Sequence, residues 1–173
     1  FYFKIHIKKR HKITIIIMDK YKNLELLDNK AEKLLERQIN SFRSLNIKAN
    51  SLIAINSILV PIFLFLIENT NYIISFLSII PFIFFFYSLI LMVKVIKSVK
   101  IFQGFNEKQF DKLVNMEYTN ILLYSIGAKK DSISDNNNII DKKNKMFNKG
   151  LKCTIIGVIS SFIIIFIKIV VHF

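Results

Sequence analysis

Residues 49–67 (ANSLIAINSILVPIFLFLI) decide the fold, because they run for 19 residues without a charged side chain. A helix rises about 1.5 Å per residue and the hydrocarbon of a bilayer is about 30 Å thick, so this run can span a membrane. Residues 69–93 form a second charge-free run. Residues 151–173 predict a third span, provided that Lys168 near its far end extends its ammonium group to the lipid headgroups.

The composition of the chain agrees with membrane insertion. Hydrophobic residues make up 53% of the 173 residues, although the net charge is +13. A soluble protein of this size has too little polar sequence to bury three helices that are apolar on every side. Strands of an outer-membrane barrel would alternate polar and apolar residues, whereas these runs are continuous. We therefore expect an all-α, polytopic integral membrane protein with about three transmembrane helices.

Residues 18–48 predict a long amphipathic cytosolic helix that continues into the first span. Apolar residues recur along it every three or four positions, with a break only at Gln38. Such a heptad-like stripe is typical of a helix that packs on other helices, either of its own subunit or of a second copy. The stripe consists of Leu24, Leu27, Ala31, Leu34, Phe42, Leu45, Ala49 and Leu52.

Residues 1–17 precede the first methionine, Met18, and are interpreted as an upstream or disordered segment. Met18 is the expected biological start. A signal peptide is the rival interpretation, but the apolar patch at residues 13–18 is shorter than the hydrophobic region of a signal peptide.

The distribution of lysines predicts the orientation in the membrane. The loop at residues 68–71 contains no lysine or arginine, whereas lysines cluster after the second span and before the third. Because basic flanks stay in the cytoplasm, we expect a cytoplasmic N-terminus and an external C-terminus in the inner (plasma) membrane of a bacterium. The expected basic residues at the membrane boundary are Lys48, Lys94, Lys97, Lys149 and Lys152.

Residues 94–150, between the second and third spans, predict a cytosolic helical segment. Asn106 is suited to cap a helix that begins at Glu107. Residues 127–138 (GAKKDSISDNNN) are polar and rich in turn-forming types, so they are predicted to be a linker. The segment is too short for an independent catalytic domain with its own core.

The sequence contains no pattern typical of a catalytic, metal or cofactor site. The four glycines are isolated, Cys153 is the only cysteine, and the three histidines lack the spacing of metal ligands. No aspartate or glutamate lies inside a predicted span. The lysines beside the spans fit anionic lipid better than nucleic acid. We expect neither an enzyme nor a nucleic-acid-binding protein, and no cofactor.

Two residues of the first span can shape how it packs or opens. Asn56 lies near its middle, and Pro61 follows one to two turns later, where it can kink the helix. The simpler interpretation is that the Asn56 amide fastens neighbouring helices by hydrogen bonds. The alternative is that these two residues line or gate a pore.

The segment KAEKLLERQINSFRSLNIKANSLIAINSILV, residues 30–60, resembles the N-terminal half of the Pycsar-type transmembrane effectors of bacterial antiphage defence. It combines an amphipathic helix with a span containing Asn56. The later layout is also similar: a second span ending in lysines, a cytosolic helix, and a last span near Gly150. Related small membrane effectors share these features.

The resemblance implies an effector that disrupts the inner membrane as a homo-oligomer within the lipid bilayer. Its trigger would be a cyclic pyrimidine nucleotide made by a partner cyclase, sensed by the cytosolic helices, although no residue is tied to that ligand. Two alternatives stay open. One is a structural or accessory membrane subunit of a larger complex, and the other is a phage holin-like pore former.

Overall fold

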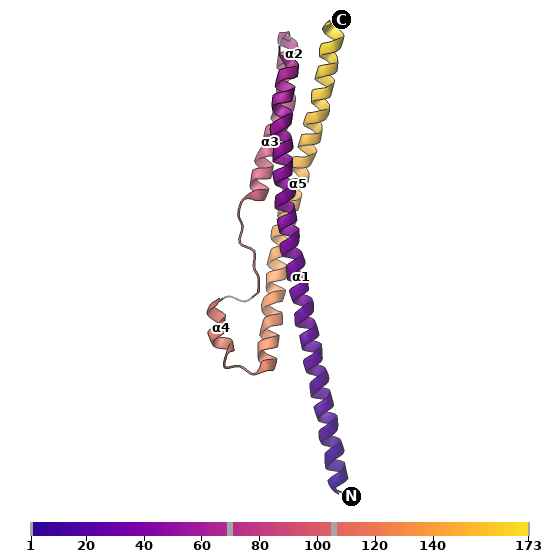
Figure 1. The fold of residues 1–173 in the computed structure, drawn as a ribbon, viewed down its shortest axis with the longest axis vertical. Helices are drawn as coiled ribbons and strands as arrows, with labels where there is room; N and C mark the ends of the chain where they lie inside the picture. Colours follow the sequence, from indigo (N-terminus) through magenta and orange to yellow (C-terminus); the bar gives the residue numbers. More distant parts are fainter. Residues whose placement is uncertain (1, 69–70, 105–106, 173) are drawn as a thin grey trace. The chain divides into compact units, whose positions relative to one another are not determined.

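The computed structural model describes the backbone of residues 2–68, 71–104 and 107–172, and the side chains of residues 21–68, 71–104 and 109–171. These residues form helices and no strand (Figure 1), which confirms the predicted all-α class for this part of the chain. Asn106, the predicted cap, lies outside the described residues. The helices are α1 (Tyr2–Ile67), α2 (Tyr72–Leu77), α3 (Ile79–Ile96), α4 (Glu107–Leu113) and α5 (Tyr118–His172).

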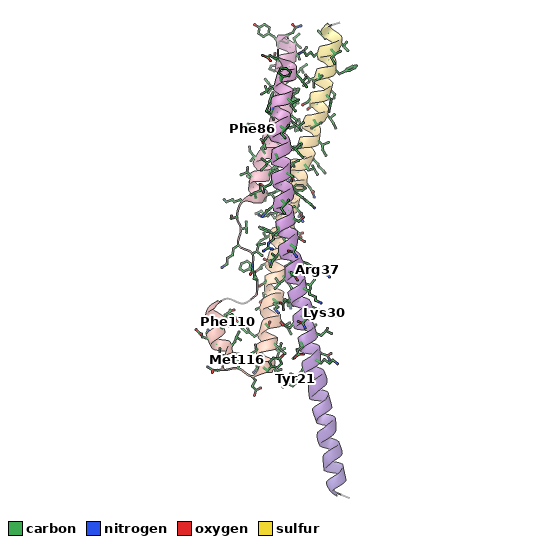
Figure 2. All side chains as sticks on the ribbon, in the orientation of Figure 1. Tyr21, Lys30, Arg37, Phe86, Phe110 and Met116 are labelled. Carbon is green, nitrogen blue, oxygen red and sulfur yellow. The ribbon has the colours of Figure 1, made fainter. Side chains whose placement is uncertain are left out.

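Three of the helical stretches are long and apolar enough to cross a membrane, as predicted: Tyr21–Ile67, Tyr72–Ile96 and Tyr118–Val171. The second stretch comprises α2 and α3, which meet at Ser78. This residue has helical dihedral angles (φ −66°, ψ −17°), so the interruption is slight. Large apolar side chains of these stretches are exposed, among them Phe86, which points away from the neighbouring helices (Figure 2).

The chain divides into two compact units. Unit 1 contains residues 1–40 and 100–138, and unit 2 contains residues 41–99 and 139–173. Helices α1 and α5 each contribute residues to both units, whereas α2 and α3 belong to unit 2 and α4 to unit 1.

In unit 2, α1, α3 and α5 pack side by side as a three-helix bundle (Figure 1). Phe42 contacts Lys143 and Asn56 contacts Thr154, so residue numbers rise together along α1 and α5 and these helices are parallel. Helix α3 runs in the opposite direction. One buried cluster consists of Leu45, Ala49, Leu52, Leu91, Met92 and Val95, and a second of Phe63, Ile74 and Ile164.

In unit 1, α1 and α5 are again parallel, because Glu25 bonds to Tyr118 and Gln38 bonds to Asn137. The connection after α3 lies against α5, where the Asn136 amide donates to the Phe102 carbonyl at 2.7 Å and accepts from the Phe102 N–H at 3.0 Å. Gly104 has a φ of +95°, a conformation that favours glycine.

The prediction of a linker at residues 127–138 is wrong, because the whole segment is helical and lies within α5. Three of its polar residues, Lys129, Ser132 and Asn136, are buried and bonded, whereas its other polar side chains are exposed. Ser132 accepts a hydrogen bond from the Gly104 N–H at 3.2 Å, and Asn136 is fully buried against Phe102. These tertiary contacts override the weak helix propensity of serine and asparagine.

The predicted apolar stripe on α1 is also partly wrong. Leu27 and Leu34 are 52% and 48% exposed, so they do not face α5. The face of α1 that packs on α5 instead recurs at alternating intervals of three and four residues. It includes the polar residues Asp28 and Gln38, which pair with polar groups of α5. We call this face the α1 seam: residues 24, 28, 31, 35 and 38 in unit 1, and residues 42, 45, 49, 52, 56, 59 and 63 in unit 2.

Candidate functional site

A buried group of uncharged polar side chains joins α1, α3 and α5 in unit 2. Asn56 of α1 is fully buried, and its Nδ2 donates to Ser88 Oγ of α3 at 3.2 Å. Thr154 of α5 donates from Oγ1 to Asn56 Oδ1 at 3.1 Å. Ser88 Oγ donates to the Gly150 carbonyl at 2.8 Å and lies 2.8 Å from Thr154 Oγ1, a contact in which either hydroxyl can donate. We call these four residues the Asn56 cluster.

The chemistry of the Asn56 cluster suits an apolar environment. A charged side chain in hydrocarbon costs several kcal/mol, whereas neutral amides and hydroxyls that bond to one another satisfy their polar atoms locally. Asn56, predicted as a gating or helix-contact residue, thus lies at a contact among three helices. Its role in gating stays a prediction.

Two glycines of α5 allow close helix packing beside this cluster. A Cβ atom at Gly157 would lie 2.9 Å from Cε1 of the buried Phe85 ring. A Cβ atom at Gly150 would collide with Met92 Cε and lie 3.4 Å from Leu91 Cβ. Small residues at such positions let membrane helices approach until backbone and side chain touch. Helix α5 therefore contacts α3 mainly through its own backbone at these two positions.

Lys168 closes the far end of unit 2. Its ammonium donates to the carbonyl of Leu66 at 2.7 Å and to that of Glu68 at 3.1 Å. These carbonyls end α1, where the last turn has no intrahelical donors and the helix dipole favours a cation. The predicted reach of Lys168 toward the headgroups therefore coincides with capping of a neighbouring helix.

Lys143 is a buried cation before the predicted third span. It is 3% exposed, its Nζ donates to the Lys97 carbonyl at 3.1 Å, and it lies 4.1 Å from the centroid of the Phe42 ring. A carbonyl and a ring face attract a cation without neutralising it. Burial lowers the pKa of the Lys143 ammonium from its ordinary value of 10.5.

The remaining predicted residues lie on the surface. Pro61 is exposed within α1, where its missing N–H leaves the Ser57 carbonyl without its usual helix donor. The predicted boundary lysines are all exposed: Lys48, Lys94, Lys97, Lys149 and Lys152.

Unit 1 holds its two long helices together with charged groups. Lys129 of α5 is 9% exposed and its Nζ lies 2.9 Å from Asp28 Oδ1 and 3.4 Å from Glu32 Oε2 of α1. Ser125 Oγ donates to the same Asp28 oxygen at 2.6 Å. Nearby, Tyr118 donates to Glu25 at 2.7 Å, and this hydrogen bond raises the pKa of Tyr118.

A groove of about 490 Å³ opens in unit 1 beside α5. Two carboxylates, Asp131 and Asp135, lie one turn apart at its edge. The other lining residues are apolar or uncharged, and none of the described ones is a lysine or arginine: Phe102, Gly104, Gln109, Leu123, Tyr124, Gly127, Ala128 and Ser132. This charge pattern favours a cationic or hydroxyl-rich ligand over a phosphate.

Sequence reasoning missed Ser88, Thr154, Lys129 and Lys143. A signal for α5 was present: every seventh residue from 122 to 164 is buried, namely Leu122, Lys129, Asn136, Lys143, Gly150, Gly157 and Ile164. Because several of these are charged, polar or glycine, a search for apolar periodicity passes over them. Polar residues can occupy heptad core positions, where they fix register.

No protein-family model, curated protein or solved structure matches the chain.

Proposed function

We propose that this protein is a membrane effector that disrupts the inner membrane of a bacterium, as part of an antiviral defence system. The observation that carries the proposal is the Asn56 cluster. It locks three apolar helices together through neutral hydrogen bonds, and it offers no carboxylate for coupled ion transport. A bundle of this kind acts on the bilayer by rearranging its helices.

The proposed orientation has the N-terminus inside, the loop after α1 outside, and the C-terminus outside. The parallel α1 and α5 segments of unit 2, with antiparallel α3, fit three successive crossings. The exposed lysines Lys94 and Lys97 after α3 and Lys149 and Lys152 on α5 then lie on the cytoplasmic side, as the positive-inside rule requires.

The trigger is proposed to be a cyclic pyrimidine nucleotide bound by unit 1. The resemblance to Pycsar-type effectors supports this ligand. The groove of unit 1 does not, because Asp131 and Asp135 repel a phosphate. A nucleotide would therefore have to bind another surface of unit 1, such as one that a homo-oligomer creates.

Permeability measurements test the membrane-disrupting role. Cells that express the chain from Met18 are given 3′,5′-cyclic CMP or UMP, and dye entry and membrane potential are followed. We expect ligand-dependent dye entry with loss of potential. The substitution Asn56→Leu should alter the dose at which this happens, whereas the same substitution at the exposed Asn50 should not. Unchanged permeability under every trigger would contradict the proposal.

An accessory subunit of a larger membrane complex is the second candidate. It is favoured by three exposed leucines on α1 of unit 1, Leu26, Leu27 and Leu34, which are 53%, 52% and 48% exposed. Such residues in water suit a protein partner. Co-purification of a partner at fixed stoichiometry, lost on changing these leucines to serine and accompanied by no growth defect, would establish this role in place of the effector.

A further inference from the structure

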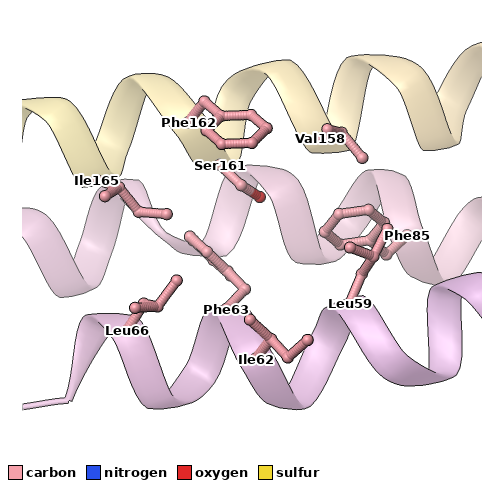
Figure 3. Close-up of a pocket in the computed structure, with 9 residues that line it drawn as sticks. All are labelled: Leu59, Ile62, Phe63, Leu66, Phe85, Val158, Ser161, Phe162 and Ile165. Atoms are coloured by element: carbon pink, nitrogen blue, oxygen red, sulfur yellow. The ribbon is translucent and has the colours of Figure 1, made fainter.

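An apolar groove of about 210 Å³ runs between α1 and α5 in unit 2, with Phe85 of α3 also lining it (Figure 3). Helix α1 contributes Leu59, Ile62, Phe63 and Leu66, and helix α5 contributes Val158, Ser161, Phe162 and Ile165. The groove is open: Ile62 and Phe162 are 50% and 68% exposed.

The lining offers no polar group to a ligand. Ser161 is its only polar side chain, and the hydroxyl is occupied by the Gly157 carbonyl at 2.8 Å. An occupant must therefore be apolar where it lies in the groove. In a helix long enough to span a bilayer, the groove faces hydrocarbon, so the apolar groups at highest concentration around it are acyl chains.

A cation lies at one end of the groove. Leu66 is the last α1 residue of the lining, and its carbonyl accepts from Lys168 Nζ at 2.7 Å. From Ser161 to Lys168 helix α5 advances about 10 Å, two turns along the same face. An ammonium has three donor hydrogens, and Leu66 and Glu68 take two of them. The third can serve an anionic oxygen.

We infer that the groove binds one acyl chain of a phospholipid whose phosphate is held by Lys168. The groove supplies a slot about 10 Å long from Leu59 to Leu66, and the lysine supplies charge complementarity where hydrocarbon gives way to headgroups. A helix of a second copy, about 10 Å or more across, is too wide to enter a groove of about 210 Å³. The inference depends on membrane insertion and is independent of the effector role.

Photolabelling tests both halves of the site. The full chain is reconstituted in phosphatidylcholine vesicles with a trace of phosphatidylglycerol or of diacylglycerol, each carrying a photoreactive group in its acyl chain. We expect adducts on the peptides containing residues 59–66 and 158–165, above those on Ile79, Ile80 and Ile83, which are exposed on α3 outside the lining. Phosphatidylglycerol should label these peptides about fivefold more than diacylglycerol, which lacks the phosphate.

Matched variants separate lipid binding from folding. Ile62→Trp fills the groove and should remove the adducts, whereas Ile58→Trp, at a 61% exposed position outside the lining, should not. In Lys168→Gln, phosphatidylglycerol and diacylglycerol should label the groove peptides equally. Lys168→Arg should restore the stronger labelling by phosphatidylglycerol. Because Lys168 also caps α1, thermal unfolding of each variant is recorded in parallel.

Three results would overturn the inference. The first is labelling spread evenly over all exposed apolar faces, and the second is unchanged labelling in Ile62→Trp. The third is a disulfide-linked dimer formed by Ile62→Cys in a Cys153→Ser background, which would place a second copy on the groove.

Discussion

Units 1 and 2 use the same helix pairing with different chemistry. In each, α1 and α5 are parallel and meet along a face with a spacing of three and four. Unit 1 places a charged pair in that face, Asp28 with Lys129. The Asn56 cluster of unit 2 is neutral, and glycines replace side chains. The charged contact of unit 1 suits a helix pair beside water, and the neutral contact of unit 2 suits hydrocarbon, because buried ions are costly in hydrocarbon.

Breaking the charged pair of unit 1 should have the largest effect on stability. Lys129→Met leaves the Asp28 carboxylate, whose side chain is 19% exposed, without its cation. We expect the free energy of unfolding in detergent to fall by about 3 kcal/mol, the lower end for a buried pair, since water still reaches Asp28. Lys130→Met removes the same charge at an exposed position and should cost little. Equal losses in the two variants would contradict the pairing.

Filling the close helix contact of unit 2 comes next. Gly157→Ala places a methyl group 2.9 Å from the Phe85 ring, so the buried ring must move. We expect a loss of about 2 kcal/mol in denaturant titrations. Gly127→Ala is the matched control, because a Cβ atom there meets nothing within 4 Å. Position 127 lies inside α5, so this variant should gain up to about 1 kcal/mol.

Removing the Asn56 amide should have a smaller effect. Asn56→Leu deletes two hydrogen bonds to Ser88 and Thr154, but these hydroxyls can still bond to each other. Interhelical hydrogen bonds in membranes contribute about 1 kcal/mol, and the loss should be of that order. The same substitution at the exposed Asn50 provides the baseline for unfolding in SDS. Identical SDS unfolding midpoints for the two variants would show that the Asn56 hydrogen bonds do not stabilise the helix contact.

The smallest effect is a pH dependence from Lys143 of unit 2. Its pKa is lowered by burial, so the folded state loses this proton before the unfolded state does. Below the lowered pKa both states are protonated and the desolvation cost is fully present. As pH rises from there toward 10.5, that cost is relieved and unfolding becomes harder.

Between neutral and alkaline pH, the free energy of unfolding of the wild type should therefore rise relative to that of Lys143→Met. Unfolding is compared at both ends of that window, with Lys142→Met at an exposed position as the control. A difference that is flat with pH, or that shifts toward the variant, would show that burial does not lower the pKa of Lys143.

The sequence predicts the helices of unit 2 better than the seams between the helices. Long charge-free runs predict membrane spans from their length and composition alone. The helical state of residues 127–138 depends on contacts of Ser132 and Asn136 with the chain at residues 102–104, which no local pattern encodes. Asn56 stands out in its span as an isolated amide, whereas its partners Ser88 and Thr154 are recognisable only once α3 and α5 are placed beside it.

Cysteine accessibility can show whether the chain crosses the membrane three times with α1 and α5 parallel in unit 2. In a Cys153→Ser background, single cysteines replace Asn71, Ser98 and Val171, all exposed positions. A membrane-impermeant maleimide is added to right-side-out vesicles. We expect labelling at positions 71 and 171 at once, and at position 98 only after the vesicles are opened. Labelling of position 98 in sealed vesicles, or of only one of positions 71 and 171, would contradict this topology.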